Sequence, residues 1–220
     1  MLAPSDSAPV SWRVDQTEAE IRRQVLELQP DFVFFQELPA MVPFIETHNL
    51  LSAHTISHSG TIATLIKKEL ADLFQAGKIE RFAVTASSQE LGITLANVHF
   101  VPGRGESGRR QEMMKKIASQ FGDQGLLIVG DTNTRVEEVA GFESLGLVGR
   151  KPPAPTWDTH SNRFRHDAPK FKAYFTRYFH NSKVVVDSVK VFDDPVQADG
   201  KSFYLSDHFP MSGIVKRSEG

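Results

Sequence analysis

Apolar residues recur along the chain at helical spacing in two places. The capping-box pattern of residues 17–20 is followed by three apolar residues on one helical face: Ile21, Val25 and Leu28. Pro30 predicts the end of this helix, because the residue before a proline avoids helical backbone angles. A second helix is predicted over residues 109–121, where Met114, Ile117 and Phe121 share a face.

Short apolar runs elsewhere predict strands. They are DFVFFQE at 31–37, TIATLIKK at 61–68, LGITLANVHF at 91–100, LLIVGD at 126–131, KAYFTRYF at 172–179 and KVVVDSVKVF at 183–192, with a last strand after SDHFP. Residues 1–16 read as an irregular arm, 151–169 as a loop and 193–203 as a polar connection. Strands outnumber helices and do not alternate strictly with them. The pattern therefore predicts an α/β (α+β) chain with a mixed β-sheet flanked by helices.

Composition narrows the class of protein. A chain of 220 residues fits one domain, 1–220, and the absence of Cys excludes disulfides and thiolate chemistry. A net charge of −2 gives no global attraction to nucleic acid or to an anionic membrane, so any phosphate binding must be local. The sequence has neither a bilayer-spanning run nor a signal sequence, and we expect a cytoplasmic protein that does not bind membranes.

Polar side chains gather where three of the predicted strands end. These are Gln36-Glu37, Asp131 with Asn133, and Ser206-Asp207-His208 before the last strand. Open α/β sheets place their ligand sites at strand ends. Carboxylate ligands without Cys favour Mg²⁺ or Mn²⁺ over zinc. Taken alone, Gly130-Asp131-Thr132-Asn133 is typical of a simple turn, and only the three strand ends together indicate a site.

Four motifs in order carry a resemblance to a known family: Gln36-Glu37, Asn97-Val98-His99-Phe100, Gly130-Asp131-Thr132-Asn133 and Ser206-Asp207-His208. The chain resembles the endonuclease/exonuclease/phosphatase superfamily of metal-dependent phosphoesterases from about residue 12 to 216. The GDTNxR pattern at 130–135 and the TWDTxxN pattern at 156–162 are similar to those of 5′-tyrosyl-DNA phosphodiesterases. The resemblance implies a four-layer sandwich of β-sheets and helices.

The resemblance also implies roles for the residues at the strand ends. Glu37 would bind the Mg²⁺ or Mn²⁺ ion with support from Asp207, and Asp131 would activate the attacking water. Asn133 would hold the phosphate, while His99 and His208 would contact the phosphoryl oxygens. A metal and neutral or cationic donors would thus surround an oxygen cluster that gains negative charge in the transition state.

Substrate contacts are expected from a second group of residues. Trp157 and Asn162 belong to the TWDTxxN pattern, and an indole can stack on any base. Arg110 resembles a family arginine in its spacing from His99. Further candidates for neutralising a nucleic-acid backbone are Lys67, Lys68, Arg104 and Arg109.

The chain departs from the family pattern at two positions. The family opens with a strand that ends in an Asn, whereas this chain begins Met1-Leu2-Ala3-Pro4, as if that strand were missing. Thr176 stands where the family has an Asp that supports the active-site histidine. We expect the Thr176 hydroxyl to hydrogen-bond His208 without supplying the negative charge of a carboxylate.

The leading hypothesis is a monomeric phosphodiesterase that hydrolyses phosphoester bonds at DNA ends, with single-stranded ends and 5′-phosphotyrosyl adducts as candidate substrates. A nuclease or phosphatase with another phosphoester substrate, and a relative that binds phosphate or nucleic acid without turnover, are the alternatives. The glycines of Gly103-Arg-Gly105-Glu-Ser-Gly108 formally match a dinucleotide fingerprint. A flexible loop beside a phosphate site explains them equally well.

Overall fold

The computed structural model describes residues 14–37, 53–162, 169–198 and 200–218. The helices of these residues are α1 (Val14–Leu28), α3 (Ser107–Phe121) and α4 (Val139–Glu143), with the short 3-10 helices η2 (Lys68–Leu73), η3 (Arg104–Glu106) and η4 (Val136–Glu138). The strands are β1 (Phe32–Phe35), β2 (His54–Ser59), β3 (Ile62–Lys67), β4 (Gln75–Ile79), β5 (Ala83–Ser88), β6 (Ile93–His99), β7 (Gly125–Asp131), β8 (Val148–Arg150), β9 (Trp157–Asp158), β10 (Lys172–Ala173), β11 (Thr176–His180), β12 (Val184–Val191), β13 (Val196–Ala198), β14 (Lys201–Phe203) and β15 (Met211–Arg217).

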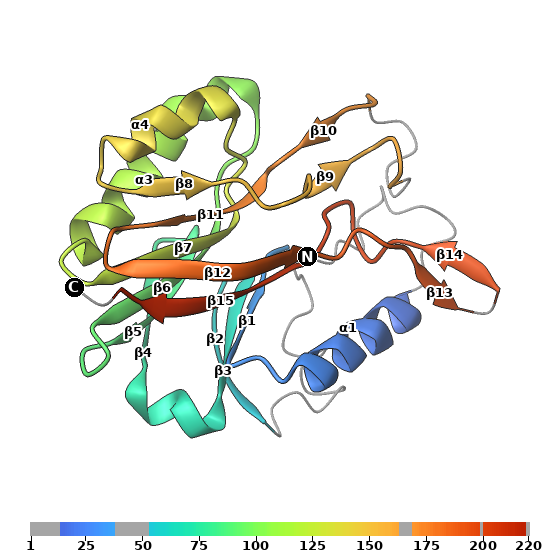
Figure 1. Ribbon diagram of the computed structural model, residues 1–220, viewed down its shortest axis with the longest axis horizontal. Helices are drawn as coiled ribbons and strands as arrows, with labels where there is room; N and C mark the ends of the chain where they lie inside the picture. Colours follow the sequence, from blue (N-terminus) through green and yellow to red (C-terminus); the bar gives the residue numbers. More distant parts are fainter. Residues whose placement is uncertain (1–13, 38–52, 163–168, 199, 219–220) are drawn as a thin grey trace.

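A six-stranded sheet in the order β4-β5-β6-β7-β11-β8 forms the centre of the molecule. Its β6–β7 pair is parallel and its other pairs are antiparallel, which confirms the prediction of a mixed sheet. A three-stranded sheet, β1-β3-β2, and a two-stranded sheet, β12-β15, lie against it (Figure 1). The short pairs β9-β10 and β13-β14 project from one end of this arrangement.

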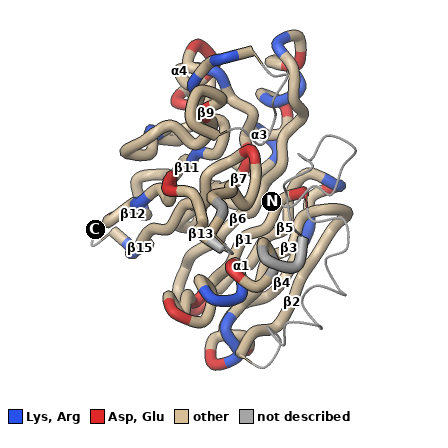
Figure 2. The backbone as a smooth tube through the Cα atoms, turned by 90° about the vertical axis from the view of Figure 1, so that its right-hand side faces the viewer, with Lys and Arg blue, Asp and Glu red and all other residues tan. Residues whose placement is uncertain are grey.

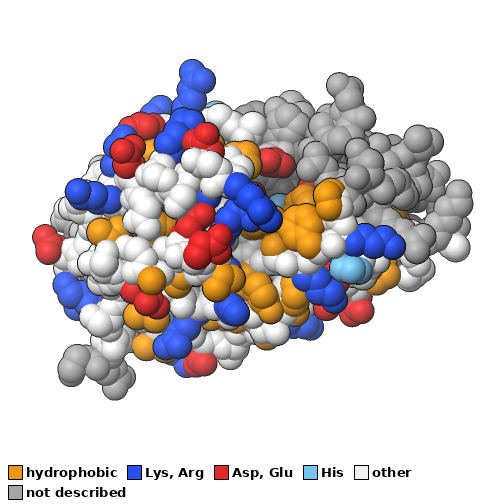
Figure 3. Space-filling model, turned by 90° about the horizontal axis from the view of Figure 1, so that it is seen from above, with side chains coloured by type: hydrophobic (Ala, Val, Ile, Leu, Met, Phe, Trp, Pro, Cys, Tyr) orange, Lys and Arg blue, Asp and Glu red, His pale blue; other side chains and the backbone are white. Residues whose placement is uncertain are grey.

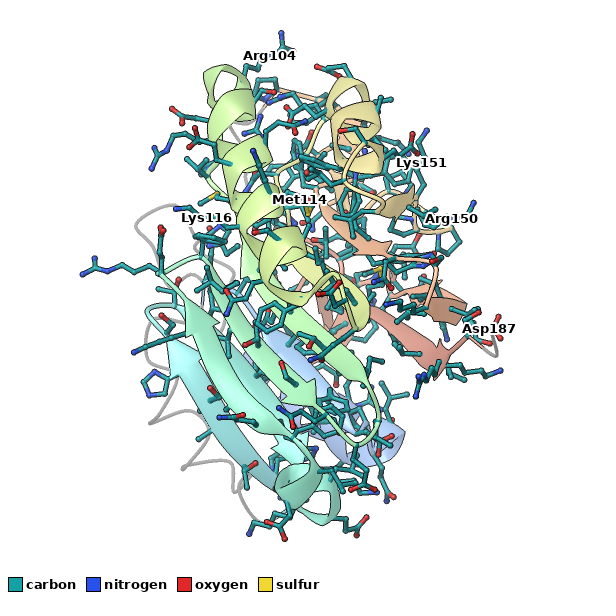
Figure 4. All side chains as sticks on the ribbon, turned by 90° about the vertical axis from the view of Figure 1, so that its left-hand side faces the viewer. Arg104, Met114, Lys116, Arg150, Lys151 and Asp187 are labelled. Atoms are coloured by element: carbon teal, nitrogen blue, oxygen red, sulfur yellow. The ribbon has the colours of Figure 1, made fainter. Side chains whose placement is uncertain are left out.

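Alternating burial along the central strands explains the layers. One face of β6 and β7 packs Val98 and Ile128 against Met114 and Ile117 of α3. Because successive strand residues point to opposite faces, Leu127 lies on the other face, packed with the two smaller sheets. Figure 4 shows α3 and α4 together over one face of the central sheet. The layers follow in the order α3 with α4, the central sheet, the two smaller sheets and α1. This order confirms the expected four-layer architecture.

An apolar cavity of about 260 Å³ lies between α1, β1 and β15. Within the part of the chain that the structure describes, β1 pairs only with β3, and β15 pairs only with β12. The start of the chain, where we expect the family's first strand to be missing, lies outside the described residues.

None of the described helices has the length and apolar character needed to cross a membrane.

Several sequence predictions about elements are wrong in detail. The first helix begins at Val14, so Thr17 is a buried residue inside it and not its cap. Strands β2, β4, β5 and β8 were not predicted, and β9 lies in the segment predicted as a loop at 151–169. Strand β5, for example, is rich in Ala, Ser and Thr and lacks a clear apolar run. The polar connection at 193–203 contains the β13–β14 hairpin. Pairing with neighbouring strands in the tertiary structure, and not local apolar character, makes these segments strands.

Basic and acidic residues are mixed on the face of the molecule that Figure 3 shows. Basic and acidic positions are interspersed along the backbone in Figure 2, and both signs lie side by side in Figure 3. Lys67 contacts Asp31 and Glu69, at the opposite end of β1 from Glu37, so it lies away from the predicted site. Arg104 extends outward at the top of the view in Figure 4. Local groups must therefore provide any attraction for a phosphate.

Candidate active site

Strand register places three predicted site residues in one row across the central sheet. His99 is the register partner of Asp131 on the parallel β6–β7 pair, and Thr176 is the partner of Asp131 on the antiparallel β7–β11 pair. All three stand at or next to the point where a strand of the sheet leaves the core. Residues that are 32 and 45 positions from Asp131 in sequence thus become its direct neighbours.

Asp131 and Asn133 occupy a tight turn that is also part of the site. Gly130 has φ 137°, and a Cβ at this position would lie 2.2 Å from the Val98 carbonyl oxygen, so only glycine fits. The Asn133 backbone N–H donates to Asp131 Oδ1 at 3.0 Å. The Asn133 side-chain amide donates to Asp131 Oδ2 at 3.1 Å and to the Phe100 carbonyl at 2.9 Å. The turn geometry therefore fixes the orientation of the Asp131 carboxylate.

Two histidines lie close to one oxygen of the Asp131 carboxylate. The Nε2 atoms of His99 and His208 each lie 3.7 Å from Asp131 Oδ2. His99 Nε2 also lies 3.3 Å from Glu37 Oε1, which links the end of β1 to the row on the central sheet. The side chain of Asp131 is only 10% exposed, whereas that of Glu37 is 50% exposed. The cluster therefore has a buried carboxylate at its base and an accessible one at its rim.

The predicted contact between Thr176 and His208 is present. Thr176 Oγ1 lies 3.0 Å from His208 Nδ1, so the hydroxyl fixes the ring plane and leaves Nε2 towards Asp131. A hydroxyl can donate or accept in this contact, but it adds no negative charge beside the imidazole. Thr176 thus supports the histidine, and its expected contact with substrate stays a prediction.

The Ser206-Asp207-His208 segment is held by hydrogen bonds to its own hydroxyl and to a neighbouring loop. Ser206 Oγ donates to Asp207 Oδ1 at 3.2 Å and accepts from the His208 N–H at 3.1 Å. The Asn162 amide donates to the Ser206 carbonyl at 2.7 Å. Asn162 is 2% exposed, and its hydrogen bond positions the segment that carries His208, while the expected substrate contact stays a prediction.

Trp157 is also placed differently from the expectation. Its ring centroid lies 4.9 Å from that of His208, in an edge-on arrangement, and 6.1 Å from that of Phe171, in a stacked one. Because Trp157 is only 8% exposed, it supports His208 and offers little open surface to a base. Phe171, at 38% exposure, is the accessible ring of this cluster.

Asp158, the aspartate of the TWDT pattern, is held by hydrogen bonds and by an ion pair with Lys172. Burial acts to raise the pKa of the Asp158 carboxyl, but hydrogen bonds from Lys172 and the His160 N–H outweigh it and hold the pKa below its usual value. Asp158 therefore stays ionised in the neutral range and ties the loop at 157–161 to β10.

Solved structures share this arrangement of sheets and helices. TDP2 of D. rerio, crystallised with a single-stranded DNA product, has a TM-score of 0.74 to this chain at 16% identity, with 94% of each chain covered. An endonuclease/exonuclease/phosphatase family protein from Bacteroides thetaiotaomicron has a TM-score of 0.67 at 16% identity, over 91% of this chain and 88% of that one. The chain has the endonuclease/exonuclease/phosphatase fold. The resemblance inferred from the motifs is thereby confirmed at the level of the fold.

Proteins of this fold include enzymes named for a different activity. A mannosyl-6-phosphatase from the same bacterium has a TM-score of 0.66 at 15% identity, over 92% of this chain and 91% of that one. Comparison of the sequence with protein-family models gives no match, and comparison with curated proteins gives none either. The endonuclease/exonuclease/phosphatase fold alone therefore does not select a substrate.

The strand-end residues fit a divalent cation held by few protein ligands. Among the described residues, no three His, Asp or Glu side chains form a ready-made ligand set. Mg²⁺ commonly binds through one or two carboxylates and completes its shell with water and substrate phosphate. Glu37, half exposed at the rim of the cluster, suits that mode. A closed zinc-type cage does not fit these residues.

Arg110 does not face the site, contrary to the expectation that it contacts substrate. Its side chain is fully buried and pairs with both carboxylate oxygens of Glu138, at 2.8 and 2.6 Å. It also donates to the Val101 and Gly103 carbonyls at 2.9 and 2.8 Å. Arg110 therefore joins α3 to η4 and fixes the loop that follows His99.

Replacing Arg110 by methionine should lower the free energy of unfolding by about 3–5 kcal/mol, because Glu138 would remain buried without its partner. Chemical denaturation measures this change. The matched control is Arg109→Met, since Arg109 is an exposed neighbour that contacts Glu106 at 3.4 Å. The control should change stability by less than about 1 kcal/mol. Equal losses in the two variants would contradict a structural role for Arg110.

Sequence reasoning gave no role to the pair formed by Gln36 and Asn97, although both residues stood in the motifs. Gln36 Nε2 donates to Asn97 Oδ1 at 2.6 Å directly beneath the cluster. The available signal was a polar amide inside an apolar strand, LGITLANVHF, where burial demands a hydrogen-bond partner.

Proposed function

We propose that this protein is a divalent-metal-dependent phosphodiesterase that acts on DNA ends, with 5′-phosphotyrosyl bonds as the candidate substrate. The single observation that carries the proposal is the convergence of His99 and His208 on the Asp131 carboxylate, with Glu37 beside His99. The fold supports phosphoester chemistry in general. The TDP2 structure with a single-stranded DNA product supports the choice of nucleic acid.

Each residue of the cluster has a chemical task in this proposal. Asp131 orients the attacking water and accepts its proton, because its carboxylate is fixed by the Asn133 turn and lies near two imidazole nitrogens. His99 and His208 donate to phosphoryl oxygens as negative charge develops on them. Asn133 reaches the phosphate only if its amide exchanges its present contact with Asp131 or Phe100 for a phosphoryl oxygen.

The proposed metal site lies at the rim of the cluster. Glu37 would hold the Mg²⁺ or Mn²⁺ ion, and Asp207 would support it from the segment that carries His208. A cation bound there would neutralise charge on the phosphoryl oxygens. Thr176 and Trp157 act one step away, since they hold the His208 ring in place.

A phosphodiesterase or phosphatase with another substrate is the second candidate. The burial of Trp157 favours it, because the residue that distinguished the tyrosyl-DNA enzymes in the sequence offers no open indole face here. The mannosyl-6-phosphatase with this fold shows that the architecture accommodates a different phosphoester.

Release of tyrosine from a 5′-phosphotyrosyl oligonucleotide in the presence of Mg²⁺ tests the first proposal. The variant Phe171→Ala should lower kcat/KM on this substrate about tenfold through lost stacking and should spare bis(4-nitrophenyl) phosphate. Leu91→Ala, an equally exposed apolar residue at 41%, is the control. Turnover of the nitrophenyl diester alone, or equal losses on both substrates, would support the second candidate. If Phe171→Ala kept full activity on both substrates, Phe171 would not stack on the substrate.

A further inference from the structure

A buried pair of side-chain amides joins two sheets beneath the candidate site. Asn97, on β6 of the central sheet, is 0% exposed, and Gln36, at the end of β1, is 9% exposed. Gln36 Nε2 donates to Asn97 Oδ1 at 2.6 Å. Because a buried amide must satisfy both its donors and its acceptor, its geometry constrains every element that it contacts.

The Asn97 amide also holds the end of the small sheet. Its Nδ2 donates to the Ala63 carbonyl at 2.8 Å and to the Phe35 carbonyl at 3.3 Å, with a further contact to Thr64 Oγ1 at 3.3 Å. Phe35 and Ala63 are register partners and form the last rung of the β1–β3 ladder. One side chain of the central sheet therefore fixes the place where β1 ends.

Glu37 follows directly from that fixed point. It adopts φ 56°, a left-handed conformation that is uncommon for a residue other than glycine and must be stabilised by its surroundings. On β6, Asn97 and His99 are two residues apart, so both side chains lie on the same face of the strand. Gln36 contacts Asn97, and the next residue, Glu37, contacts His99. The two contacts between the end of β1 and strand β6 therefore lie next to each other.

The neighbouring strand leaves room for this pair. A Cβ at Gly130 would lie 3.2 Å from Gln36 Nε2 as well as 2.2 Å from the Val98 carbonyl oxygen. The glycine before Asp131 thus serves two purposes: it allows the tight turn, and it lets the Gln36 amide approach β7.

We propose that Asn97 is a positioning residue for catalysis, which acts through Gln36 to hold the Glu37 carboxylate beside His99 and Asp131. This inference rests on the proposed function, in which Glu37 binds the divalent cation. Asn97 itself touches neither substrate nor metal. It sets the distance between the small sheet, which carries Glu37, and the central sheet, which carries the rest of the cluster.

The test compares Asn97→Ala with Thr94→Val in the full chain. Thr94 is the matched control, because it is a buried polar residue at the other end of β6 that hydrogen-bonds Ser87 and Gln124 at 3.0 Å each. Gln36→Met, which removes the amide donor and preserves most of the volume, serves as the second variant if Asn97→Ala does not fold. The measurements are Mn²⁺ affinity, kcat and KM on bis(4-nitrophenyl) phosphate, and the amide NMR resonances of Glu37 and His99.

In Asn97→Ala and Gln36→Met we expect Mn²⁺ to bind about 10–100-fold more weakly, as is usual when the residue that orients a metal ligand is lost. We expect kcat to fall with little change in KM, and the Glu37 resonance to shift. Thr94→Val should lose stability without any of these effects. Unchanged Mn²⁺ affinity and an unshifted Glu37 resonance in a folded Asn97→Ala, or unchanged Mn²⁺ affinity and an unshifted His99 resonance in a folded Gln36→Met, would overturn the inference. If the wild type itself neither binds Mn²⁺ nor turns over, the proposed function fails, whereas the Glu37 resonance still decides whether Asn97 positions that residue.

Discussion

Replacing Asp131 by asparagine is expected to reduce kcat/KM roughly 10²–10⁴-fold, the contribution typical of a positioned general base. The amide keeps the size of the carboxylate but cannot take a proton from water. One oxygen remains to accept from the Asn133 N–H, so the turn should persist. Initial-rate kinetics with bis(4-nitrophenyl) phosphate, at saturating Mg²⁺, measure the effect.

The control for this prediction is Asp123→Asn, which makes the same chemical change at an exposed position. Its kinetics should match those of the wild type. If Asp131→Asn retained full activity, Asp131 would not be the base. If the wild type and Asp131→Asn bound phosphate or DNA equally and neither turned it over, the protein would be the non-catalytic relative considered from the sequence.

Replacing Glu37 by glutamine is expected to raise the Mg²⁺ concentration needed for half-maximal activity by about tenfold or more. The substitution removes a negative charge from the only predicted metal ligand that is half exposed at the rim of the cluster. A hard cation prefers a carboxylate oxygen to a neutral amide oxygen. A Mg²⁺ titration of activity in both proteins measures the change.

Chelation provides the complementary measurement. EDTA should abolish the activity of the wild type, and added Mg²⁺ or Mn²⁺ should restore it. Glu90→Gln, at an exposed position, is the charge-matched control and should leave the titration unaltered. Activity that persists in EDTA would refute metal dependence, and with it the role assigned to Glu37.

The motifs predicted which residues lie together at the strand ends, because strand ends can be recognised locally. An apolar run such as LLIVG predicts a buried strand, and the polar residues that follow it mark the point where the strand leaves the core. Strand register then placed His99, Asp131 and Thr176 in one row. The contact between Thr176 and His208 was expected from the sequence, and the structure contains it.

Local sequence patterns could not decide the roles of three other predicted residues, Arg110, Asn162 and Trp157. Each has a side chain suited to binding a substrate, and each is almost fully buried in the structure. An arginine and its partner Glu138 are 28 residues apart, so only the packing of α3 against η4 shows that they meet. Their burial shows that each supports its neighbours in the fold, and their substrate contacts stay predictions.

The sequence by itself determined the class of fold, the strand ends and the types of donor available, because hydrophobic periodicity and residue chemistry are local properties. Only the tertiary structure decided which donors converge and which are buried. The pair formed by Gln36 and Asn97 shows why: its partners are 61 residues apart and lie on different sheets. The free energy that a buried polar group contributes depends on its solvation and on its hydrogen-bond partners. Both are set when the sheets pack together.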